Sequence, residues 1–198
     1  MLSLRRRRDR AISPRRGIFL SRGPGHSACA IAILVLASCS PPPRIDESVT
    51  FARAIEHTAI PVFARVSPTL YRGGEPGEVG LHNLRDRGIK TVISLREIPP
   101  VQDFLDHYGM AAFHIPMAAE RPPSSIEEKR FLDLVSDTSL HPVFVHCVRG
   151  KDRTGVMIAL YRVRIQGWST QDAIAEMKHF GYSSNAYPAL EKYVRSLR

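Results

Sequence analysis

In the second half of the chain, a cysteine stands between a buried strand and a helix. The apolar run at residues 142–145 predicts a strand, and residues 154–166 predict a helix. The stretch from His146 to Gly155 reads His-Cys-Val-Arg-Gly-Lys-Asp-Arg-Thr-Gly. A loop that runs into a helix N-terminus can hold an anion, because the first N–H groups of the helix have no partner within it. The segment therefore predicts a phosphate-sized anion site against the Cys147 thiol.

The chemistry of this loop depends on the charge of Cys147. A cysteine attacks phosphorus as a thiolate, whereas a free cysteine at neutral pH is mostly thiol. The helix dipole and Arg153 would both favour the thiolate, and the planar guanidinium can pair with two phosphate oxygens. Gly150 would let the loop fold inward, so that successive N–H groups form an anion nest. Thr154 could donate its hydroxyl to the sulfur, and His146 could orient the loop through a backbone hydrogen bond.

The pattern His-Cys, five residues, Arg-Thr-Gly resembles the signature loop of the cysteine-dependent phosphatases, the protein tyrosine and dual-specificity superfamily. It is most similar to bacterial dual-specificity-like members and to relatives acting on phosphoinositides. The resemblance implies that Cys147 forms a phosphocysteine intermediate and that Arg153 stabilises the transition state. It also implies a set of phosphate-binding residues: Val148, Arg149, Gly150, Lys151, Asp152 and Arg153. The alternative is a buried structural cysteine before a basic helix cap, with Arg149 and Lys151 as solvated loop residues.

The proton donor is the open part of this site. The leaving oxygen of a phosphate ester needs a proton, and in the resembling family an aspartate upstream of the cysteine strand commonly supplies it. The matching segment, residues 113–123, holds no aspartate, and its only carboxylate is Glu120. Glu120 is therefore the candidate general acid, unless it is a surface residue paired with Arg121. Asp152 is a second candidate, and a substrate with a good leaving group would need neither.

The first 39 residues predict an export signal. Eight arginines precede an apolar run at residues 28–37, which is too short to span a bilayer and suits a secretory signal core. Residues 36–39, Leu-Ala-Ser-Cys, resemble the lipobox of bacterial lipoproteins. On this interpretation the chain is cut before Cys39, which carries the lipid; the alternative is an ordinary secretory signal. We therefore expect an exported protein, lipid-anchored to a bacterial membrane on its periplasmic side.

Removing this leader changes the charge and the cysteine content. The chain has 28 basic and 19 acidic side chains, a net of +9. Residues 1–39 hold eight of the basic and one of the acidic ones, which leaves 20 against 18, a net of +2. The basic charge thus belongs mostly to the leader and gives no support for a nucleic-acid partner. Of the three cysteines, Cys29, Cys39 and Cys147, only Cys147 would remain as a free thiol.

The rest of the chain alternates strands and helices. We expect a tether and N-terminal segment at residues 40–60, with a short helix at 51–56, and then a catalytic domain at 61–198. Strands are predicted at 62–66, 69–72, 91–96, 111–116 and 142–145, and helices at 76–87, 101–108, from Ser124 or Ser125 to 135, 154–166, 170–179 and 186–197. This alternation predicts an α/β domain with a mostly parallel central sheet flanked by helices, as in dual-specificity phosphatases. Ligands bind such sheets at the carboxyl ends of the strands, where Cys147 lies.

Three functions fit these features. The leading one is a protein tyrosine or dual-specificity-like phosphatase that needs no metal or other cofactor, because no histidine shows metal-ligand spacing with a partner. A second keeps the chemistry but acts on phosphoinositides or soluble inositol phosphates, which Lys151 slightly favours. A third is a non-catalytic phosphate-binding module, which the missing aspartate favours. Arg72 and Arg96, in two predicted strands, either line the site or form internal ion pairs.

Overall fold

The computed structural model describes residues 50–99 and 102–198. The predicted signal at 1–39, the lipidation residue Cys39 and the first part of the tether lie outside the described residues. Within the described ranges, no helix is both long and apolar enough to cross a bilayer.

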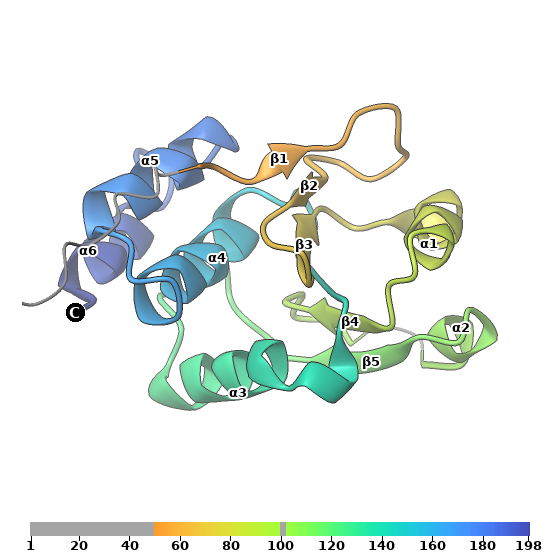
Figure 1. Ribbon diagram of the computed structural model, residues 1–198. Helices are drawn as coiled ribbons and strands as arrows, with labels where there is room; N and C mark the ends of the chain where they lie inside the picture. Colours follow the sequence, from red (N-terminus) through yellow and green to blue (C-terminus); the bar gives the residue numbers. More distant parts are fainter. Residues whose placement is uncertain (1–49, 100–101) are drawn as a thin grey trace, which may run out of the picture. The chain divides into compact units, whose positions relative to one another are not determined.

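A six-stranded mixed sheet forms the centre of the fold (Figure 1). Its order is β1 (Arg53–Ala54), β2 (Ala64–Arg65), β3 (Leu70–Gly73), β6 (Val143–His146), β4 (Thr91–Ser94) and β5 (Ala111–His114). The pairs β1–β2 and β2–β3 are antiparallel, and the four strands from β3 to β5 are parallel to one another. The predicted α/β class with a mostly parallel sheet is confirmed.

Helices cover both faces of this sheet (Figure 1). On one face lie α1 (Gly77–Asp86) and α2 (Gln102–His107), and on the other lie α3 (Ser125–Ser136), α4 (Asp152–Arg164), α5 (Thr170–His179) and α6 (Pro188–Ser196). A single 3₁₀ turn, Thr138–Leu140, follows α3. Every residue of β4 and β6 is buried, as expected for parallel strands with helices on both sides.

The local signals at the helix ends explain why the predicted ranges agree closely with these helices. The Ser124 hydroxyl accepts a hydrogen bond from the Glu127 N–H, and the Glu127 carboxylate accepts one from the Ser124 N–H. This reciprocal capping box starts α3 at the predicted place. The Ser169 hydroxyl caps α5 by accepting a hydrogen bond from the N–H of Asp172.

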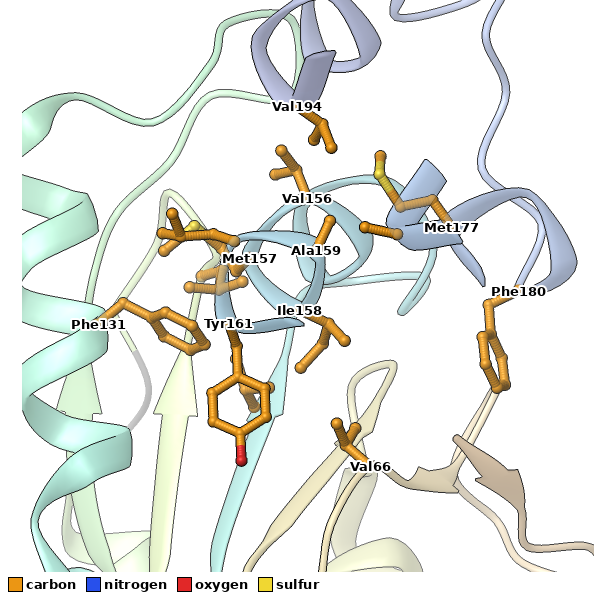
Figure 2. Close-up of a cluster of buried hydrophobic side chains, with 14 of the residues drawn as sticks. Val66, Phe131, Val156, Met157, Ile158, Ala159, Tyr161, Met177, Phe180 and Val194 are labelled. Atoms are coloured by element: carbon orange, nitrogen blue, oxygen red, sulfur yellow. The ribbon is translucent and has the colours of Figure 1, made fainter. Parts of the chain in front are cut away.

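Helix α4 is the centre of the larger hydrophobic core. Its residues from Val156 to Leu160 are at most 1% exposed. Figure 2 shows side chains from the neighbouring elements around it, with Phe131 of α3, Met177 of α5 and Val194 of α6 among them. A helix that is apolar on all sides belongs in an interior. The cysteine loop therefore runs from the central strand of the sheet into the most deeply buried helix.

The predicted helix at residues 51–56 is wrong. Arg53–Ala54 form the edge strand β1 instead. Ala52 is 5% exposed, and its N–H donates to Glu176 Oε1 at 2.6 Å. These partners are distant in sequence, so no local pattern could indicate them. The described part of the 40–60 segment thus packs onto the domain, and the boundary expected at residue 61 falls inside the sheet.

Candidate active site

The loop between β6 and α4 closes tightly around the sulfur of Cys147. This side chain is 3% exposed, and the Gly150 N–H donates to its Sγ at 3.3 Å. Gly150 has a φ of +73°, in the left-handed region that disfavours residues with a Cβ. A Cβ built there would lie 2.8 Å from the Gly73 carbonyl oxygen and closer still to the nitrogen of Gly74. Both backbone conformation and packing therefore require a glycine at this position.

Residues at and just after the end of β3 form hydrogen bonds with the cysteine loop and the start of α4. β6 lies between β3 and β4, and His146 is in register with Gly73 on one side and Ser94 on the other. The Val148 carbonyl accepts a hydrogen bond from the Glu75 N–H at 3.0 Å. The Thr154 hydroxyl donates to the Gly73 carbonyl at 3.4 Å, not to the sulfur as its suggested role required. The Thr154 hydroxyl is buried at the start of α4, and the carbonyl at the end of β3 is its acceptor there.

Arg153 spans the carboxyl ends of two strands. Its Nη1 donates to the Met117 carbonyl at 3.1 Å and to the Leu95 carbonyl at 3.4 Å. These residues follow β5 and β4 respectively. Because both bonds use Nη1, the rest of the guanidinium fork can pair with an anion in the loop.

His146 is held as a neutral ring behind the loop. It is 5% exposed and stacks on Phe144, with the ring centroids 5.6 Å apart. Burial lowers its pKa to about 4, and the charges of Arg96 and Arg153 act in the same direction. Its Nδ1 lies 3.2 Å from the Cys147 carbonyl oxygen. A carbonyl can only accept, so Nδ1 carries the proton in this contact. The contact has the form of the predicted backbone hydrogen bond.

This neutral ring predicts an acid-sensitive fold. The pKa of about 4 in the folded protein lies below the ordinary 6.5, so the unfolded chain binds the proton first as the pH falls. The contribution of His146 to stability is complete above its ordinary pKa of 6.5. It is lost as the pH falls from there to about 4, by roughly 3 kcal/mol in total. Urea unfolding across this range measures how the free energy of unfolding changes with pH, and His146→Gln should remove this dependence. Glu127 and Glu191, with pKa values lowered to about 2, lose their contributions at lower pH. An unchanged slope in His146→Gln would contradict the assignment.

Asp152 ties the loop to the connection between α5 and α6. The carboxylate is buried; Oδ2 accepts from Arg149 Nη2 at 3.0 Å, and Oδ1 accepts from the Ser183 N–H at 3.4 Å. Arg149 Nη2 also lies 3.3 Å from the Tyr187 hydroxyl. These contacts occupy both oxygens of Asp152 and hold the exposed side chain of Arg149.

Lys151 and Val148 complete the loop. The half-buried Lys151 side chain lies along the turn after α5, where a Cβ on Gly181 would be 3.2 Å from its Cδ and Cε. Val148 is 46% exposed at the loop surface.

Glu120 stands on the exposed loop between β5 and α3. It makes no hydrogen bond or ion pair with another residue in the part of the chain that the structure describes. The alternative pairing with Arg121 does not form, because the Arg121 guanidinium binds Glu127, with Nη2 to Oε1 at 2.6 Å. No hydrogen bond or ion pair joins Glu120 to the cysteine loop within the described residues, and no described interaction competes for its carboxylate.

The structure distinguishes the two alternatives for Arg72 and Arg96. Arg96 forms an ion pair with Glu75. Arg72, in contrast, is completely buried and donates from Nη2 to the Gly150 carbonyl at 2.7 Å. The signal in the sequence was an arginine in an otherwise buried strand, but its partner is a loop carbonyl and not a carboxylate.

Comparison with known proteins supports what this geometry suggests. The family model described as a DSP-PTPase phosphatase fused to NAD+ kinase matches residues 55–195. The dual specificity protein phosphatase TpbA of Pseudomonas aeruginosa is 30% identical over 166 residues, covering 84% of this chain and 69% of its own length.

Two solved structures show the same fold. A crystal structure of a TpbA variant in complex with phosphotyrosine superposes with a TM-score of 0.66 at 29% identity, covering 76% of this chain and 92% of the other. The core catalytic domain of a PP-IP phosphatase from Saccharomyces cerevisiae, in complex with citrate, has a TM-score of 0.63 at 25% identity and covers 71% and 88%. The chain belongs to the DSP-PTPase family and is a cysteine-dependent phosphatase.

Proposed function

We propose that this chain dephosphorylates proteins on tyrosine and other hydroxyl-bearing residues, with Cys147 as the nucleophile. The observation that carries the proposal is the closed loop around the Cys147 sulfur, which ends at the N-terminus of α4. The thiolate attacks phosphorus and the ester oxygen leaves, which gives a phosphocysteine and the free hydroxyl. Water then attacks the same phosphorus and releases inorganic phosphate and the thiolate. Arg153 and the loop N–H groups stabilise the charge on the transferred oxygens.

Glu120 is the proposed donor of the proton to the leaving oxygen. It has the required carboxyl group, it lies on the exposed loop after β5, and no described interaction engages it. We expect Glu120→Gln to slow hydrolysis of phosphotyrosine peptides by about 100-fold, within the usual range for a general acid. An aryl phosphate with a highly acidic leaving group should be affected far less. Equal effects on both substrates would exclude Glu120, and Asp152→Asn would then be the next variant to compare.

A second test of this proposal concerns the turn at Gly150. The variant Gly150→Ala must move the loop away from Gly73 and Gly74, and a displacement of this kind costs about 100-fold in kcat/KM. Gly167→Ala is a matched control, because Gly167 has a φ of +69° but nothing within 4 Å of a built Cβ. Aryl phosphate hydrolysis and thermal melting of both variants measure the effect. A Gly150→Ala enzyme as active as Gly167→Ala would show that the loop tolerates the side chain.

Inositol phosphates are the second candidate substrate class. The similarity to the yeast PP-IP phosphatase favours them, and so do the basic side chains of Arg149 and Lys151 within the loop. A phosphate-release panel of phosphopeptides, phosphoinositides and soluble inositol phosphates, compared by kcat/KM, tests the order of preference. Turnover of inositol phosphates well above that of every phosphopeptide would replace the leading proposal.

We also propose that the enzyme acts outside the cytoplasm, held by a lipid on Cys39. The support is the basic leader, the short apolar run and the lipobox-like residues 36–39. Fractionation of cells that express the full chain should find it in membranes, and Cys39→Ala should release it. Recovery of the unmodified chain in the soluble cytoplasmic fraction would contradict the export proposal.

A further inference from the structure

We propose that Arg72 is a positioning residue, which orients the Gly150 carbonyl and supplies the buried positive charge that stabilises the Cys147 thiolate. The inference rests on the proposed role of Cys147 as the nucleophile. Arg72 itself touches neither substrate nor the reacting atoms; it acts through the loop and through its charge.

The loop needs one carbonyl to be held outward. An anion nest works only if the N–H groups point into it and the carbonyl oxygens point away. The Gly150 N–H faces the Cys147 sulfur at 3.3 Å, while its carbonyl accepts from Arg72 Nη2 at 2.7 Å. Arg72 therefore holds the residue at which the loop turns, with the oxygen directed to the guanidinium and the N–H to the sulfur.

The guanidinium is itself fixed in place. It lies over the Phe180 ring, with Cζ 4.3 Å from the ring centroid. Its strand, β3, ends at Gly73, and the backbone of Gly73 and Gly74 lies directly against Gly150. A rigid donor behind the loop keeps the hydrogen bond in one geometry.

Among the described residues, the two buried carboxylates, Glu176 and Asp152, are paired with Arg162 and Arg149 and not with Arg72. Arg162 and Glu176 form an ion pair with side chains 3% and 1% exposed, so this pair is neutral as a whole. Arg72 has no carboxylate partner among the described residues. Its pKa is lowered to about 10, mainly by burial and also by repulsion from Arg162, although attraction to Glu176 and to Cys147 opposes the shift. Arg72 thus stays charged at neutral pH, and we expect its charge to favour the thiolate form of Cys147.

Stability alone does not account for this arginine. Two of its nitrogens, Nε and Nη1, are buried and find no hydrogen-bond partner among residues 50–99 and 102–198. An unpaired buried donor costs free energy that an apolar side chain of the same shape would not. Buried polar groups normally have hydrogen-bond partners, and one that lacks them beside a nucleophile points to a functional role.

Three substitutions test the effect of the Arg72 charge separately from the effect of Arg72 on folding. Arg72→Gln removes the charge and keeps a hydrogen-bond donor, and Arg72→Lys keeps the charge. Arg87→Gln is the control, at an exposed arginine whose guanidinium donates to the Asn83 carbonyl and lies 5.7 Å from the Phe63 ring centroid. The readout is the rate of alkylation of Cys147 by iodoacetamide as a function of pH, followed by mass spectrometry of its peptide in the full chain. Alkylation reports the thiolate and needs no turnover.

We expect Arg72→Gln to slow alkylation near neutral pH by about tenfold or more, with Arg72→Lys much closer to the wild type and Arg87→Gln unchanged. Aryl phosphate turnover should fall in both Arg72 variants, because neither side chain places its donor against the Gly150 carbonyl as Arg72 Nη2 does. A folded Arg72→Gln protein alkylated as fast as the wild type would overturn the inference. If that variant does not fold, an Arg72→Lys protein alkylated tenfold more slowly than wild type overturns it equally. A wild-type protein with a reactive thiolate but no phosphatase activity would refute the proposed function and leave the role of Arg72 standing.

Discussion

Replacing Cys147 with serine should abolish turnover while leaving phosphate binding intact. The hydroxyl is nearly isosteric with the thiol but is not ionised at neutral pH, so no nucleophile remains at the centre of the loop. We expect hydrolysis of an aryl phosphate to fall by at least about 10⁴-fold, as when a covalent nucleophile is removed from other hydrolases. The measurement is phosphate release at saturating substrate by wild type and Cys147→Ser.

Anion binding by Cys147→Ser tests the anion site separately from the nucleophile. The loop N–H groups and Arg153 remain when serine replaces the cysteine, and without the negative charge of the sulfur an anion should bind at least as tightly. Calorimetric titration with inorganic phosphate or a phosphotyrosine peptide measures this. Arg153→Ala, in contrast, should lose binding and turnover together. Full turnover by Cys147→Ser would show that the reaction does not pass through a phosphocysteine.

Glu176→Gln should produce the largest loss of stability of any single charge removal considered. The Glu176 carboxylate accepts hydrogen bonds from Arg162 Nε at 2.9 Å, from Arg162 Nη2 at 2.6 Å and from the Ala52 N–H at 2.6 Å. Both side chains of the pair are almost completely buried. The substitution leaves the Arg162 guanidinium buried without its countercharge, which costs about 3–5 kcal/mol. Urea unfolding at neutral pH gives the free energy of unfolding directly.

An exposed pair provides the control for this variant. Lys129 and Asp133 are 77% and 61% exposed, and Asp133→Asn should change the free energy of unfolding by at most about 0.5 kcal/mol. The double variant Arg162→Met with Glu176→Leu should recover part of the loss, because it removes both buried charges together. A Glu176→Gln protein as stable as Asp133→Asn would mean that water or a rearrangement compensates the buried guanidinium.

Local patterns predicted most of the elements for identifiable reasons. Helix α5 was predicted with its observed bounds, because Ser169 caps it and its apolar side chains recur at helical spacing. Strand β4 was predicted because a continuous apolar run between turn residues suits a strand buried on both faces. Both signals lie within about a dozen residues of chain. The helix expected at residues 51–56 failed because that segment is ordered by its pairing with β2 and not by its own residues.

The sequence by itself determined that a thiol, a turning glycine and an arginine lie together before a helix, because His146–Gly155 is continuous in the chain. Only the tertiary structure decided what supports them. Arg72 reaches Gly150 across 78 residues, Thr154 reaches Gly73 across 81, and Ala52 reaches Glu176 across 124. The first two pairs meet because the parallel order β3-β6-β4 places the ends of distant strands beside the loop, and no periodicity in a sequence records which strands are neighbours.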